Sequence, residues 1–318
     1  MFTVQSEPFD SLTLYRLRNE ETGECAAIVG DYGAILHRLS LLTDNDQLIQ
    51  VIDGYETAEQ LLAEGSRSFR GTLLFPFPNR VRDGRYAFDG QSYQLPVNEI
   101  DRGHALHGHL YHAPFEVVAE GASETGAFLI LEYEADGKAE GYPFKYLLNL
   151  DFRLDEAGFS CKTVIQNLEE RDIPVGIGYH PYFQLGDNAD EWLLKLPVES
   201  QLEIDDRLIP NGEERIPARY QEFASLKGDV LDNAYRVRPT EGEAITQLVN
   251  PGQNVTLTVW QRTGPGQFNY LQVFTPESRR SIALEPMTGA PDAFNNGQGL
   301  IRLAPDQILE ATFGVRVE

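Results

Sequence analysis

Residues 126–167 read GAFLILEYEADGKAEGYPFKYLLNLDFRLDEAGFSCKTVIQN, and this stretch decides the fold prediction. It contains three strand-like runs, Phe128–Tyr133, Tyr146–Leu154 and Phe159–Ile165. Asp136-Gly137 separates the first two runs, and glycine accepts the positive φ that hairpin turns require. The stretch therefore predicts consecutive antiparallel strands joined by turns.

The same pattern extends along the chain. Further strand-like runs are Leu12–Leu17, Cys25–Val29, Tyr86–Phe88, Phe115–Val118, Val255–Trp260 and Ile308–Val317, with further turns at Asp83-Gly84, Asp89-Gly90, Glu156-Ala157-Gly158 and Asn211-Gly212. One short helix is predicted at Thr57–Glu64, closed by Gly65. A single open sheet of this many strands would leave one apolar face unburied. We therefore predict an all-β fold, a large antiparallel β-sandwich with few short helices.

The composition is that of a folded globular protein. Apolar residues make up 42% and charged residues 24% of the 318 residues, which permits a sizeable core. No Pro- or Ser-rich linker, charge block or internal repeat divides the sequence, so we expect a single domain over residues 1–318. Cys25 and Cys161 show no metal-ligand or redox spacing, and we expect two reduced, buried thiols.

The formal net charge of -23 argues against nucleic-acid and anionic-membrane partners, because long-range repulsion opposes both encounters. The N-terminus lacks a basic start with an apolar run, and no segment approaches the about 20 apolar residues that span a bilayer. We therefore expect a cytoplasmic protein with a small-molecule ligand. A high charge disfavours self-association only weakly, so a monomer and a homodimer both remain open.

Two strand-like segments end in titratable groups. In Ser281–Glu285, period two places small residues on the face that ends in Glu285, which leaves room for a ligand beside a candidate general base. In Val175–Pro181, Gly176 and Gly178 share a face with His180, a candidate general acid. Taken singly, each group could instead be a rim carboxylate or an ordinary buried histidine.

Polar groups elsewhere suit a polyol ligand. Asn79 and Arg80 follow the rigid Phe75–Pro78 segment, and a guanidinium with five donors binds hydroxyl groups well. His107 lies in the His104–His112 cluster, which offers either hydrogen-bond donors or metal ligands, since His107 and His109 would point the same way on a strand. We expect no metal, because the cluster holds no Cys or carboxylate to complete a site.

In their order along the chain these motifs resemble the aldose 1-epimerase (galactose mutarotase) family. The resemblance spans about residue 25 to the C-terminus and is carried by Asn79-Arg80, Gly84-Arg85-Tyr86, Phe88, Gly90, Tyr93, Leu95, Asn98, Leu106-His107-Gly108, His180-Pro181-Tyr182-Phe183, Leu231-Asp232-Asn233, Leu284-Glu285-Pro286 and Pro291–Asn295.

The resemblance implies a galactose mutarotase-like supersandwich, a sugar cleft on one sheet, no cofactor, and interconversion of the α and β anomers of a free aldose. By matched position, Glu285 would take the proton of the anomeric hydroxyl and His180 would protonate the ring oxygen. Asn79, Arg80, His107 and Asp232 would bind the substrate. The family's Leu-His-Gly-Gly reads Leu-His-Gly-His here, so His109 is a further candidate for the cleft.

Several alternatives stay open at this point. His104 or His112 could replace His107 as a donor, and Asp229 competes with Asp232. A hexose-phosphate mutarotase would need local cations, for which Arg80, Arg82 and Arg85 are candidates. A glycoside-processing enzyme would use Asp232 and Glu285 as paired carboxylates, and a non-catalytic protein would only bind the sugar.

Overall fold

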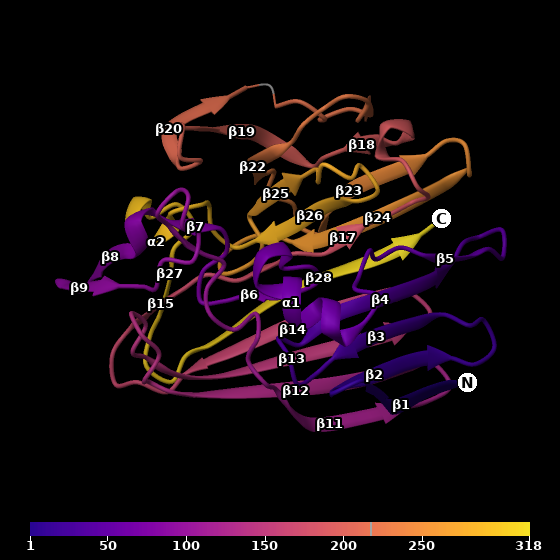
Figure 1. Cartoon of the computed structure of the whole chain (residues 1–318), viewed down its shortest axis with the longest axis horizontal. Coiled ribbons are helices and arrows are strands. Elements are labelled where there is room, and N and C mark those ends of the chain that lie inside the picture. The colour runs from indigo at the N-terminus through magenta and orange to yellow at the C-terminus, as the bar shows by residue number, and fades with distance from the viewer. Residues whose placement is uncertain (217) are drawn as a thin grey trace.

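The computed structural model describes residues 1–216 and 218–318, and antiparallel strands make up most of it (Figure 1). The largest sheet has the order β11 (Glu116–Ala122), β12 (Gly126–Asp136), β13 (Lys145–Asp155), β14 (Gly158–Asn167), β28 (Ile308–Val317), β24 (Val255–Arg262), β23 (Glu243–Asn250), β18 (Leu193–Lys195) and β21 (Ala224–Ser225). Residues 126–167 thus form three neighbouring strands of this sheet, β12, β13 and β14.

Two further sheets form the second layer. One has the order β20 (Pro210–Arg215), β19 (Val198–Ile204), β22 (Asp232–Val237), β25 (Tyr270–Phe274), β26 (Ile282–Met287), β16 (Gly178–Tyr179) and β6 (Leu73–Leu74), with β17 (Tyr182–Phe183) paired to β26. The other has the order β1 (Phe2–Phe9), β2 (Leu12–Asn19), β3 (Cys25–Val29), β4 (Ile35–Leu42) and β5 (Leu48–Gln50). A bridge between Ile52 and Phe183 joins them.

Smaller elements decorate the connections. They are the strand pairs β7 (Arg80–Val81) with β10 (Ala105–Leu106), β8 (Arg85–Phe88) with β9 (Gln91–Gln94) and β15 (Ile173–Val175) with β27 (Ile301–Leu303), the helices α1 (Ala58–Ser68) and α2 (Ala293–Asn296), and 3-10 turns at Arg82–Gly84 and Ala189–Glu191. In the described part of the chain, no helix has the length and apolar character that crossing a membrane requires.

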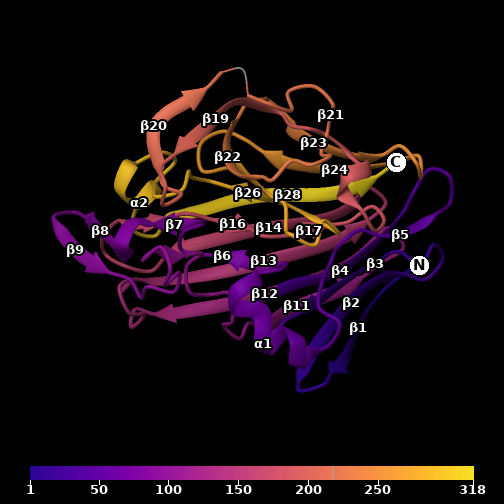
Figure 2. The same cartoon turned by 45° about the horizontal axis from the view of Figure 1, so that its top comes forward.

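The hydrophobic core lies between the layers. β2 lies against β12 and β13 and β4 lies against β28, and the tilted view shows β1 and β2 next to β11 and β12 (Figure 2). The side chains alternate along β14, where every second residue is buried. Tyr179 of β16 contacts Phe313 of β28, and its hydroxyl is hydrogen-bonded to Thr163 of β14. The predicted all-β sandwich with few short helices is confirmed.

Two local predictions were wrong. The helix does not close at Gly65 but continues to Ser68 and ends at Phe69 in a left-handed conformation. Gly65 lies on the buried face, where a Cβ would stand 3.1 Å from the Leu61 side chain, so it serves close packing and not termination. Both cysteines are free, but only Cys161 is buried, whereas Cys25 is partly exposed.

Candidate active site

Glu285 is held in the middle of the eight-stranded sheet. All six residues of β26 are buried, with Ile282 and Leu284 in the core and Glu285 lining a cavity of about 330 Å³. The face of small residues is only partly open, because Ser281 is buried and donates a hydrogen bond to Asp53 instead of lining the cavity. The predicted room for a ligand therefore lies beside Glu285 itself.

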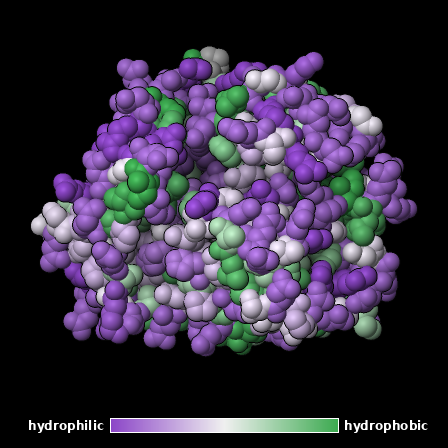
Figure 3. Space-filling view, in the orientation of Figure 1, coloured by the Kyte–Doolittle hydropathy of each residue, from purple (hydrophilic) through white to green (hydrophobic). Residues whose placement is uncertain are grey.

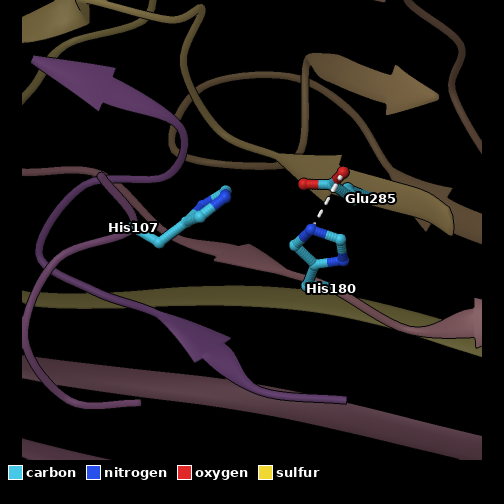
Figure 4. Close-up of side chains that lie close together, drawn as sticks. All are labelled: His107, His180 and Glu285. Carbon is cyan, nitrogen blue, oxygen red and sulfur yellow. Dashed lines mark ion pairs between the residues drawn. The ribbon is translucent and has the colours of Figure 1, made fainter. Parts of the chain in front are cut away.

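His180 lies next to Glu285 in the same cavity. Its backbone N–H donates to Thr72, its backbone oxygen accepts from Gly71, and its ring stacks on Tyr182 at 4.9 Å and 7°. The Nε2 atom stands 3.5 Å from Glu285 Oε1 (Figure 4). The second histidine nitrogen and the second carboxyl oxygen, Nδ1 and Oε2, are buried without a hydrogen-bond partner among the described residues.

The two glycines before His180 perform a packing function. A Cβ on Gly178 would lie 2.7 Å from the Pro78 side chain, and one on Gly176 would lie 2.9 Å from it. The expected close approach to these glycines is confirmed, and the neighbour is the Phe75–Pro78 segment. This contact leads the chain directly to Asn79 and Arg80 in the cavity wall.

Burial shifts the pKa values of the pair in opposite directions. It raises the pKa of Glu285 well above its ordinary value, and the negative charge of Asp232 raises it further. It lowers the pKa of His180 to about 3. Because a low-dielectric site penalises both charged forms, the pair is most stable as a neutral imidazole beside a protonated carboxyl.

His107 approaches the pair from a separate loop. Figure 4 shows its ring directed toward His180 and Glu285, and the two imidazole rings meet edge to face at 5.2 Å. The Asn79 backbone N–H donates to His107 Nδ1 at 3.2 Å. Burial lowers the pKa of His107 well below its ordinary value, so the ring is neutral and carries its proton on Nε2. His107 is therefore a hydrogen-bond donor to a ligand.

Arg80 is fixed by a carboxylate that the sequence interpretation did not include. Its Nε donates to Glu99 Oε2 and its Nη2 to Glu99 Oε1, both at 2.9 Å, and its Nη1 donates to Asn79 Oδ1 at 3.3 Å. Three of the five guanidinium N–H groups are thus satisfied, and two remain for a ligand. Burial alone would raise the pKa of Glu99, but Arg80 and Arg102 lower it below its ordinary value.

Asp232 lines the cavity and Asp229 does not. Gln272 donates to Asp232 Oδ1 at 2.6 Å, and Gln272 lies opposite Glu285 in the register of β25 and β26. Asp229 instead pairs with Arg219 and accepts from Tyr220. Of the two aspartates that the sequence left open, Asp232 is therefore the one at this cavity, and Gln272 is a second cavity residue that sequence reasoning missed.

The other histidines of the cluster lie elsewhere. His104 is buried and accepts the Asp83 backbone N–H, and His109 faces a second cavity and contacts the Tyr146 hydroxyl at 3.4 Å. His112 is exposed and also borders that second cavity. The expectation that His107 and His109 point the same way was wrong, because His107 and the next residue both have positive φ and break the strand alternation.

The motif at Pro291–Asn295 does not line the cavity but forms hydrogen bonds with the strand that carries Arg80. The Asp292 backbone N–H donates to the Arg80 carbonyl, and Asp292 Oδ1 accepts from the Arg82 backbone and from the Asn295 side chain. These bonds hold both ends of β7. Asn98 similarly holds the Leu106 backbone through its carbonyl and amide, which fixes the start of the His107 loop.

His107, His180 and Glu285 are close enough together to be considered as metal ligands, with one donor atom of each within 4.8 Å of the others. The hydrogen bond from Asn79 argues against this use, because it places the His107 proton on the Nε2 atom that faces the pair. To bind a metal together with the pair, His107 would need a free lone pair on Nε2 and not a proton. The donor set fits proton transfer better than metal binding.

Comparison with known proteins gives the family. The sequence matches the aldose 1-epimerase family over residues 13–316. An uncharacterized Escherichia coli protein, YihR, is 27% identical over 242 residues, which are 73% of this chain and 74% of that protein. A probable aldose 1-epimerase of Arthroderma benhamiae is 26% identical over 201 residues, 57% of this chain and 44% of that protein.

Solved structures give the same fold. A galactose mutarotase-like protein from Clostridium acetobutylicum has a TM-score of 0.88 at 18% identity, covering 100% of this chain and 98% of that one. Galactose 1-epimerase from Lactobacillus acidophilus has a TM-score of 0.79 at 17% identity, with 100% and 98% coverage. Since the family match extends over nearly the whole sequence, this chain belongs to the aldose 1-epimerase family.

Proposed function

We propose that the protein is an aldose 1-epimerase that interconverts the α and β anomers of a sugar by opening and reclosing its ring. The observation that carries the proposal is the buried pair, with His180 Nε2 3.5 Å from Glu285 Oε1 in a sugar-sized cavity. Ring opening requires removal of a proton from one oxygen and addition of a proton to its neighbour in one encounter. Two groups at this spacing reach the anomeric hydroxyl and the ring oxygen together.

The reaction needs no atom beyond the sugar and the pair. Glu285 takes the proton of the anomeric hydroxyl, a carbonyl forms at the anomeric carbon, and the bond from that carbon to the ring oxygen breaks. The electron pair of that bond goes to the ring oxygen, which takes a proton from His180. Rotation about the bond between the first two carbons exposes the other face of the aldehyde, and the reverse steps close the ring as the opposite anomer.

Burial assists the opening step. The opening step starts from the ionic form of the pair, a carboxylate and an imidazolium, which burial makes the minor form of the free site. The step leaves the pair neutral. Because the raised pKa of Glu285 and the lowered pKa of His180 both favour the neutral pair, desolvation stabilises the state that follows ring opening relative to the ionic pair before it. Reclosure returns both protons and restores the starting state.

The remaining cavity residues hold the sugar in this scheme. Neutral His107 donates from Nε2 toward the ring oxygen, because its ring stands beside His180. Asp232, which accepts a hydrogen bond from Gln272, accepts another from a sugar hydroxyl near Glu285. Asp232 is close to Glu285, because its negative charge raises the pKa of that carboxyl. Arg80 donates from its two remaining N–H groups, and Asn79 fixes both Arg80 and His107.

Exchange spectroscopy tests the proposal. We expect wild type to exchange the anomers of at least one sugar among glucose, galactose, xylose and arabinose faster than buffer alone, and Glu285→Gln and His180→Asn to lose about 100-fold or more of that rate. Glu243→Gln is the matched control, because Glu243 forms only an exposed ion pair with Arg316. Release of reducing ends from oligosaccharides, or binding without exchange, would refute the proposal.

A further inference from the structure

One side of the cavity is lined by arginines. They are Arg67 from the last turn of α1, Arg80 from β7 and Arg102 from the loop between β9 and β10. A single carboxylate serves two of them, since Glu99 Oε1 lies 2.9 Å from Arg80 and 3.0 Å from Arg102. This side of the cavity therefore has three guanidinium groups and one carboxylate.

Arg67 has no ion-pair partner. Across residues 1–216 and 218–318, no carboxylate lies within 4.0 Å of its guanidinium, although Glu64 precedes it by three residues on the same helix. Most arginines of this acidic chain do pair with a carboxylate, and the visible face of the molecule is largely hydrophilic (Figure 3). Glu99 thus offsets one of the three arginine charges on this side of the cavity, whereas the other carboxyl groups that line it, Asp232 and Glu285, belong to the eight-stranded sheet.

We propose that the preferred sugar carries an anionic group on the exocyclic substituent of the ring carbon that follows the ring oxygen, and that Arg67 and Arg102 bind it. This inference rests on the proposed mutarotation. A phosphate, sulfonate or carboxylate accepts several hydrogen bonds from guanidinium groups, which neutral hydroxyls cannot match in strength. The arginines would thereby select the substrate class without touching the reacting atoms.

The direction of bound sugar follows from the pair. In the proposed reaction Glu285 lies at the anomeric carbon. Asp232 is near enough for its charge to raise the pKa of Glu285, so the hydroxyls next to the anomeric carbon face these two carboxyl groups of the eight-stranded sheet. His180 and His107 mark the ring oxygen. The arginines lie on the His107 side of the cavity. Asn79 donates from its backbone to His107 and accepts from Arg80 at its side chain, and Glu99 joins Arg80 to Arg102. Phe69, two residues after Arg67, contacts the His107 ring at 4.7 Å. The substituent beyond the ring oxygen therefore extends toward the arginines.

The arginines considered from sequence are not the ones available. Arg82 pairs with Asp205 at 2.9 Å, and Arg85 donates to Gln94 on the β8–β9 hairpin, where it lines a different cavity. Arg80 is held by Glu99 through two of its nitrogens. Only Arg67 and Arg102 reach the cavity with guanidinium N–H groups that the described residues leave largely uncommitted.

Rates on matched sugars test this inference. The probes are glucose, glucose 6-phosphate, glucuronic acid and 6-deoxy-6-sulfoglucose, each corrected for exchange in buffer. We expect wild-type kcat/KM to be at least tenfold higher on one anionic sugar than on glucose, mainly through KM. The identity of that sugar distinguishes phosphate, carboxylate and sulfonate. In Arg67→Gln and Arg102→Gln this preference should fall about tenfold each, while Arg85→Gln, on the hairpin, keeps the wild-type ratio.

The two proposals fail in different ways. If no sugar exchanges faster than in buffer, mutarotation itself is wrong. If glucose exchanges as fast as every anionic sugar, or if the Arg67 and Arg102 variants keep the wild-type preference, the inference about the anionic group is overturned while mutarotation stands. Titration calorimetry with inorganic phosphate provides a second readout, because the two variants should bind it at least several-fold more weakly than Arg85→Gln does.

Discussion

Substitution of Glu99 by alanine tests whether one carboxylate organises the arginine side of the site. Glu99 and Arg80 have side chains that are 11% and 9% exposed, and two hydrogen bonds of 2.9 Å join them. Removing one partner of a buried pair leaves the other charge uncompensated, at a cost of about 3–5 kcal/mol. Because Arg80 borders a cavity, we expect the lower end, about 3 kcal/mol.

The expected change in melting temperature follows from chain length. About 2.1 cal/mol/K per residue gives 318 residues an unfolding entropy of roughly 0.7 kcal/mol/K, so 3 kcal/mol lowers the Tm by about 4 °C. Glu243→Ala is the matched control, because its ion pair with Arg316 is 38% exposed on both sides and contributes at most about 1 kcal/mol. Its Tm should fall by little more than 1 °C.

Kinetics provide the second readout of the Glu99 variant. An Arg80 side chain without its carboxylate no longer presents its two remaining N–H groups in one place, so kcat/KM on the best sugar should fall at least tenfold. Scanning calorimetry and exchange spectroscopy measure the two effects on the same samples. Equal Tm values for the Glu99 and Glu243 variants, together with an unchanged KM, would show that Glu99 does not organise the site.

Four further predictions concern the site and the loop beside it. Gly108→Ala should cost more than about 2 kcal/mol in thermal unfolding, because φ is +70° and the new Cβ would overlap a backbone carbonyl oxygen; a wild-type Tm contradicts this. Gln272→Ala should raise KM about fivefold to tenfold with a smaller effect on kcat, because Asp232 loses the hydrogen bond that orients it toward the sugar. A change in kcat alone would contradict this role of Gln272. The pKa of Glu285 is raised, so wild-type stability is lost as pH rises through its folded-state pKa, and the Tm gain of Glu285→Gln should grow from pH 4 to 8. The pKa of His180 is lowered to about 3, so wild-type stability is lost as pH falls from about 6.5 toward 3, and the Tm gain of His180→Asn should grow in that direction; pH-independent differences refute both.

The sequence was sufficient to predict the strands that carry local signals. The runs Cys25–Val29 and Ile308–Val317 match β3 and β28 residue for residue, because their limits depend on turn residues next to them. The two-residue strand β6 had no such signal. It pairs with β16, and β16 pairs with β26, so in each case the partner strand lies about 100 residues further along the chain.

Side-chain direction was the main source of error at the site. Period two holds along β14 but fails at His107, where a positive φ turns the chain and sends His107 and His109 into different cavities. Glu99 and Gln272 were missed for another reason. Each matters only through a partner that is remote in sequence or opposite in register, Arg80 for one and Asp232 for the other.

The net charge illustrates why a sum over the whole chain does not describe a site. A value of -23 predicts repulsion of anions at long range, but exposed charges are screened beyond about 8 Å at physiological ionic strength. Within the cavity the nearest groups decide, and on the side away from Asp232 and Glu285 the single carboxylate of Glu99 faces Arg80 and Arg102 while Arg67 stands without an ion pair among the described residues. Acidic residues on the outer surface slow the approach of an anionic sugar and leave its bound state nearly unaffected. Raising the salt concentration should therefore speed association with an anionic sugar while weakening its contact with the partly exposed Arg102, and the first effect should be absent for glucose.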